Sequence, residues 1–163
     1  MLAQNITFGV LALVICVSAI RVVTTKNVVH AALYLVLVLS GVAGIFILLA
    51  AEFLAIVQVL VYIGAIVVLF LFGIMLTRAP IGRSNELDND QRFIGAVVGL
   101  ALFGLLAAIL NDGFGDTKIE ATEVGRTGDV GLSIFQTFVI PFEVISVLLL
   151  AALVGAVVIA RRD

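Results

Sequence analysis

Five long apolar segments follow one another along this chain of 163 residues and restrict its fold more than any other feature. A helix rises about 1.5 Å per residue, so about 20 apolar residues cross the roughly 30 Å hydrocarbon core of a bilayer. Lipid offers backbone groups no partner, and the alternating polarity of a β-barrel is absent, so the spans must be helices. We expect an all-α polytopic membrane protein, a single integral membrane domain over residues 1–163. Its five transmembrane helices are expected near residues 3–20, 28–50, 53–76, 93–110 and 138–160.

The composition excludes several other classes of protein. Hydrophobic residues make up 63% of the chain and charged residues 12%, which is too apolar for a soluble domain. The net charge of -2 gives no support for nucleic-acid binding. The single cysteine, Cys16, lies within an apolar segment, so neither a disulfide framework nor a metal-binding cluster is expected. No phosphate-binding loop, dinucleotide fingerprint or nucleophile motif is present. We therefore expect no catalytic site, metal or cofactor in this chain alone.

The distribution of basic residues predicts the orientation in the membrane. Two of the nine lie in the loop after the fourth segment, residues 111–137, and seven lie at the opposite ends of the segments. Because cytoplasmic loops carry the excess of lysine and arginine, the N-terminus is expected outside and the C-terminus in the cytoplasm. The loop 111–137 is then extracytoplasmic. The seven residues on the predicted cytoplasmic side are Arg21, Lys26, Arg78, Arg83, Arg92, Arg161 and Arg162.

The third segment carries polar groups that a helix facing only lipid does not need. Gln58 and Tyr62 are four residues apart and are expected on one face, and Gly64 follows near the middle of the span. Glycine weakens the local helix, and buried polar groups need partners, which together suit a π-type bulge. Losing or gaining such a bulge would rotate Val68 and the residues after it by roughly 100°. Ordinary close packing at Gly64, with Tyr62 bonded to a neighbour, explains the same residues, and both interpretations stand at this point.

Ionisable residues are absent from the centres of the segments, which does not favour a proton pump formed by this chain alone. Glu52 and Glu143 lie near segment ends, and each is expected in the first turn of a helix, where a carboxylate suits the positive end of the dipole. His30 is expected to form a hydrogen bond at the interface; a proton relay is the alternative. Pairs of small residues four apart are candidate helix contacts: Ser40 with Gly44, Gly95 with Gly99, and Ala151 with Gly155.

Four passages resemble one family, subunit J of bacterial NADH-quinone oxidoreductase, the counterpart of mitochondrial NADH dehydrogenase subunit 6. Tyr62-Ile-Gly64-Ala-Ile-Val-Val68-Leu-Phe resembles the family's third span. Asn27-Val-Val-His30-Ala-Ala-Leu33-Tyr34-Leu resembles the start of its second span, with Val28 where proline is common. Glu52-Phe-Leu-Ala-Ile-Val-Gln58 resembles the lead into the third span, with glutamine where some relatives have glutamate. Pro141-Phe-Glu143-Val-Ile-Ser-Val-Leu-Leu-Leu is similar to the last span.

The resemblance implies a non-catalytic membrane subunit of respiratory complex I, a proton-translocating enzyme of the bacterial plasma membrane. FMN, iron–sulfur clusters, NADH and quinone are expected in other subunits, and the implied partners are the quinone-cavity subunit, the antiporter-like subunits and the lipid bilayer. The family's interconverting π-bulge would fall on Tyr62, Gly64 and Val68. Gln58 cannot titrate, so only hydrogen bonding is expected there. A subunit of a related cation/proton antiporter or membrane-bound hydrogenase, or a purely structural membrane subunit, is the alternative.

Overall fold

The computed structural model describes residues 2–76, 91–115 and 126–161, and within these ranges the regular structure is entirely helical. Five spans are long and apolar enough to cross a membrane, which confirms the predicted all-α polytopic fold. Four of them contain the helices α1 (Leu2–Thr24), α2 (Val28–Leu48), α5 (Arg92–Phe114) and α7 (Val139–Ala160). The remaining span, Glu52–Leu76, is composed of three consecutive helical segments described below. Arg78, Arg83 and Arg162, used in the orientation argument, lie outside the described residues.

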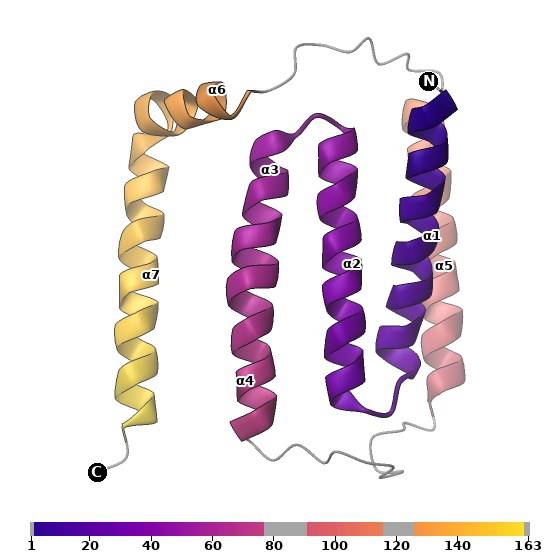
Figure 1. Cartoon of the computed structure of the whole chain (residues 1–163), viewed down its shortest axis with the longest axis horizontal. Helices are drawn as coiled ribbons and strands as arrows, with labels where there is room; N and C mark the ends of the chain where they lie inside the picture. The colour runs from indigo at the N-terminus through magenta and orange to yellow at the C-terminus, as the bar shows by residue number, and fades with distance from the viewer. Residues whose placement is uncertain (1, 77–90, 116–125, 162–163) are drawn as a thin grey trace.

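The spans alternate in direction, as Figure 1 shows. The N-terminus lies at the same end as the turn between α2 and the third span, and the C-terminus lies at the other end, where α1 ends. The described basic residues follow the same division. Those at the end with the C-terminus are Arg21 in the last turn of α1, Lys26 between α1 and α2, Arg92 at the start of α5 and Arg161 after α7, whereas Arg126 precedes α6 at the other end. This agrees with the expected alternation, while the side of the membrane that each end faces stays a prediction.

Among the described residues, the most closely packed region is the contact between α1 and α2, continued by the third span. Its buried apolar residues are small or β-branched: Ala32, Ala43, Ala55 and Val67. Two glycines of α2 bring the helices together, because a methyl group at Gly41 would overlap Ile15 Cγ1 and one at Gly44 would lie 3.1 Å from Leu11 Cδ2. The predicted contact at Gly44 is therefore confirmed. Its partner glycine is Gly41 rather than Ser40, whose hydroxyl donates to the carbonyl of Val36 at 2.8 Å.

By contrast, α5 and α7 are not packed on this bundle. No Cα atom of α5 lies within 8 Å of another described helix, and α7 approaches only the segment that precedes it. None of the residues in either hydrophobic window is buried. In α5 and α7 alike, a methyl group at Gly95, Gly99 or Gly155 would meet nothing within 4 Å. The small-residue pairs predicted in these two spans therefore make no contact with other described parts of the chain.

Both ends of α2 have well-defined helix caps. Asn27 precedes α2, and its Oδ1 accepts hydrogen bonds from the amides of Val29 at 2.9 Å and His30 at 3.4 Å. At the other end, the amide of Ala51 donates to Phe46 O, and that of Ala50 to Ile47 O, which is the Schellman arrangement. Ala50 has a φ of 56°, the left-handed conformation that glycine usually provides.

The region predicted as an extracytoplasmic loop, residues 111–137, contains helix. The helix α5 continues to Phe114, and α6 (Thr127–Leu132) and the π-helix η3 (Ser133–Thr137) occupy the end of the region. Figure 1 shows α6 lying across the top of the molecule, beside the start of the third span. Hydropathy missed these elements because α6 is short and carries polar residues and two glycines, so it lacks the long apolar run of a span.

Candidate functional site

The third span contains a π-helical segment at its centre. It begins as α3 (Glu52–Val57), continues as the π-helix η1 (Gln58–Val67), and ends as α4 (Val68–Leu76). In a π-helix the amide pairs with the carbonyl five residues back, so each hydrogen-bonded loop encloses one more residue than in an α-helix. This geometry lies where Gln58, Tyr62 and Gly64 indicated it, although it extends over ten residues rather than a single bulged turn.

Gly64 lies inside η1, and the structure shows why a side chain would be crowded there. A methyl group added to it would lie 3.3 Å from the carbonyl oxygen of Val59, five residues earlier. That separation is tighter than nine in ten real contacts of this kind, so the carbonyl would have to move by a few tenths of an ångström. The crowding comes from the backbone of η1 itself, not from a neighbouring helix. Close packing against another described helix therefore does not explain the glycine.

Gln58 joins the beginning of η1 to α2. Its side chain is 7% exposed, and its Nε2 donates to the carbonyl oxygen of Leu39 at 3.5 Å. A buried amide needs such a partner, since lipid supplies none. The first residue of η1 is thus held against α2 by a polar contact and by burial.

Tyr62 has a different environment, although the α-helical spacing placed it on the face of Gln58. Its side chain is 46% exposed, and no hydrogen bond of its hydroxyl is found among the described residues. The extra residue per turn of η1 changes the angle between side chains four apart, which separates the two. Val68, the first residue of α4, is likewise 46% exposed. Tyr62 and Val68, which were predicted to act in coupling, are therefore each left about half exposed by the described residues.

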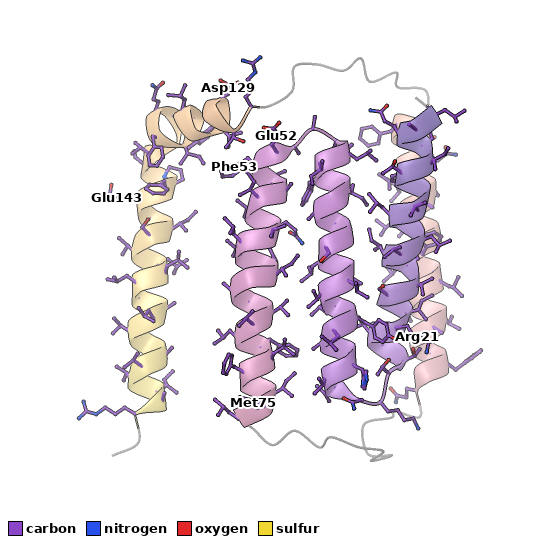
Figure 2. All side chains as sticks on the ribbon, in the orientation of Figure 1. Arg21, Glu52, Phe53, Met75, Asp129 and Glu143 are labelled. Carbon is purple, nitrogen blue, oxygen red and sulfur yellow. The ribbon has the colours of Figure 1, made fainter. Side chains whose placement is uncertain are left out.

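Glu52 lies in the first turn of α3, as predicted, and is exposed. It borders a groove of about 510 Å³ whose other lining residues are apolar. These residues come from the end of α2 and one face of the third span: Ile47, Ala55, Ile56, Val59 and Leu60. In Figure 2, Glu52 lies at the end of α3 nearest to α6, which begins close to Asp129. The groove reaches the first turn of η1 through Val59 and Leu60.

Glu143 does not occupy a first helical turn, so this prediction is wrong. The helix α7 begins at Val139, two residues before Pro141, which makes Glu143 its fifth residue. Pro141 is tolerated inside the first turn because amides there have no intrahelical partner. The dipole effect falls off within the first turn, so a capping role does not account for this carboxylate. His30 lies in the first turn of α2, is exposed, and has its backbone amide capped by Asn27.

The second π-helix, η3, was not expected from the sequence. It contains no glycine, so the signal that marked η1 was missing. Phe135 in η3 contacts Phe142 in α7 edge-to-face, with ring centroids 5.1 Å apart. Among the described residues no group of three or more histidine, cysteine or acidic side chains could hold a metal ion.

These observations define a small polytopic membrane protein with a π-helix in a central span and two spans that pack on no other described span of the chain. Residues 18–159 match the family model described as NADH-ubiquinone/plastoquinone oxidoreductase chain 6. The match covers most of the chain, so the chain belongs to this family.

Several relatives align over nearly the whole chain. F(420)H(2) dehydrogenase subunit J of Methanosarcina mazei is 40% identical, over 98% of this chain and 92% of the relative. The chloroplastic NAD(P)H-quinone oxidoreductase subunit 6 of Chlorokybus atmophyticus is 41% identical, over 91% of this chain and 79% of the relative. NAD(P)H-quinone oxidoreductase chain 6 of Leptolyngbya boryana is 39% identical, over 98% of this chain and 81% of the relative. All three names describe one subunit or chain of a larger oxidoreductase.

Proposed function

We propose that this chain is a non-catalytic membrane-arm subunit of a proton-pumping quinone oxidoreductase, and that its third span couples quinone reduction in a neighbouring subunit to proton translocation. Family membership supports the assembly. The observation that carries the coupling role is the π-helix η1 at the centre of a membrane span. FMN, iron–sulfur clusters, the reduced donor and quinone belong to other subunits in this proposal, and the enzyme lies in the bacterial plasma membrane.

The coupling depends on two arrangements of η1. In one, the segment is π-helical as described here; in the other, part of it becomes regular α-helix. Removing one residue from a turn rotates the chain beyond it by roughly 100°. Because Gln58 is buried and bonded to α2, we expect the beginning of the segment to stay in place while the part after Gly64 turns. Bulky exposed side chains on α4, including Val68 and Phe70, would then enter or leave the space beside a neighbouring subunit.

Tyr62 gives this space a polar character. A phenol within the hydrocarbon region requires a hydrogen-bond partner, and none is found among the described residues. In the proposal its hydroxyl bonds to water or to a polar side chain of the neighbouring subunit. Rotation of the apolar residues beside it then hydrates or dries this part of the proton pathway. A ligand or redox event shifts the equilibrium between the two arrangements of η1 only if it interacts more favourably with one of them than with the other. In this proposal, that difference in free energy comes from the quinone-binding subunit.

The proposal does not depend on the electron donor. The names of the relatives differ in this respect, with F(420)H(2) in one and NAD(P)H in others. Most of the described residues belong to candidate membrane spans, so in this proposal the donor binds elsewhere in the assembly. Co-purification with a peripheral arm that oxidises NADH separates complex I from a related antiporter or membrane-bound hydrogenase. Mass spectrometry of the complex in mild detergent provides this measurement.

Substitution of Gly64 tests the coupling role directly. In Gly64→Val, the side chain crowds the carbonyl of Val59, so we expect proton pumping to fall while electron transfer from the donor to artificial acceptors is retained. Tyr62→Phe removes one hydroxyl and keeps the shape, so its effect on pumping should be smaller. Pumping is measured in membrane vesicles, with the amount of assembled complex as the control. Equal loss of both activities in a normally assembled complex would contradict a coupling role and favour a structural subunit.

A further inference from the structure

Glu143 is a carboxylate within a membrane span that no described part of the chain neutralises. It is the fifth residue of α7, which places it about 6 Å beyond the start of the helix. A helix of 22 residues is about as long as the hydrocarbon core is thick, so with α7 centred in the bilayer Glu143 would lie just inside the edge of the core. It is exposed, and no ion pair or hydrogen bond of its side chain is found among the described residues. Acidic residues within membrane spans generally pair with another group or face a water-filled cavity.

The position of α7 leaves this carboxylate open to another chain. No Cα atom of α7 lies within 8 Å of any other described span. Figure 2 shows Glu143 on the side of α7 that faces away from α3. Residues spaced three and four apart share one side of a helix, so Val147, Leu150 and Val154 continue the same stripe. All three are more than half exposed, at 62%, 66% and 56%.

We propose that this stripe docks a transmembrane helix of a neighbouring subunit, and that the docked helix carries a lysine or arginine opposite Glu143. The three apolar residues provide the van der Waals packing that drives helix association in lipid. The charge opposite Glu143 fixes the register of the two helices and the choice of partner. This inference rests on the proposed membership of a larger enzyme complex, but not on the coupling role of η1.

Photo-crosslinking in membranes that contain the whole complex tests the docking. A benzophenone amino acid replaces Leu150 on the stripe or, as the matched control, Leu148, which is similarly exposed at 64% but points about 160° away around the helix. The cross-linked peptides are identified by mass spectrometry. From position 150 we expect an adduct with a membrane segment of another subunit, carrying lysine or arginine at the level of Glu143. From position 148 the same adduct should be at least about tenfold less abundant.

Charge reversal then tests the role of the carboxylate. Glu143→Lys should lower the adduct from position 150 at least about tenfold, because it places two like charges together in a desolvated contact. Changing the partner's basic residue to glutamate in the same strain should restore the adduct. If Glu143→Lys alone prevents the complex from accumulating, the double change should restore accumulation, and failure to do so overturns the proposal.

Other outcomes also overturn it. These are adducts only with lipid, adducts with a second copy of this chain, a partner segment without a basic residue, or a yield unchanged by Glu143→Lys. Each of these results is independent of the pumping assay on Gly64→Val. A loss of pumping in that variant, combined with any of them, would leave the proposed function in place and remove only the docking of α7.

Discussion

Replacing Gly64 with alanine is the smallest change that biases the third span. The added methyl group would lie 3.3 Å from Val59 O, so η1 would have to shift its carbonyl to accept it. Alanine is also more favourable than glycine inside a regular α-helix, by about 0.8–1.0 kcal/mol. If the added methyl group is crowded by Val59 O only in the π-helical arrangement, the equilibrium between the two arrangements of η1 shifts toward the α-helical one. The shift is at least about 1 kcal/mol, or roughly fivefold in the equilibrium constant.

The matched control is Gly73→Ala in α4 of the same span. A methyl group at Gly73 meets nothing within 4 Å, so the change has the same chemistry without the crowding in η1. The assay is the number of protons pumped per electron in membrane vesicles, measured with the rate of quinone-linked oxidation. We expect a lower ratio in Gly64→Ala and an unchanged ratio in Gly73→Ala. Equal ratios in the two variants would refute the reasoning, because the contact with Val59 would then have no functional consequence.

Three further predictions concern the packing and caps that position η1. Gly41→Ala should destabilise the α1–α2 contact by about 1–3 kcal/mol, because the methyl overlaps Ile15, and Ile15→Ala should recover part of the loss in a double-mutant cycle of detergent unfolding. Ala50→Gly should raise stability by about 1 kcal/mol, seen as a higher midpoint of thermal unfolding, because glycine accepts the positive φ without strain. Asn27→Ala should cost about 1 kcal/mol and speed hydrogen exchange at the amides of Val29 and His30; unchanged exchange would contradict the cap.

The membrane spans could be predicted from the sequence because their signal is local. Hydropathy over about 20 residues decides whether a helix can cross the bilayer, whatever it packs against. The π-helix was also indicated locally, by a glycine and two polar residues within one apolar segment. The short helix α6 and η3 had no comparable signal, since neither is long or uniformly apolar.

Relations between helices were less predictable. Ser40 and Gly41 are adjacent, and either could have faced α1; only the observed side of α2 selects Gly41 as the close contact with Ile15. Similarly, Glu143, two residues after Pro141, was expected in the first turn of a helix, whereas the helix begins at Val139 and Glu143 is its fifth residue. A proline marks a helix start only to within a turn, because several positions there need no amide donor.

Because α5 packs on no other described helix, its insertion into the membrane and its lateral position in the bilayer have different physical origins. Its apolar sequence is sufficient for insertion, since a window of mean hydropathy 2.7 gains its stability from lipid. No packing against the described helices of its own chain fixes its lateral position. We therefore expect other subunits to determine the lateral position of α5 in the bilayer, so that the tertiary structure of this chain is completed during assembly of the complex.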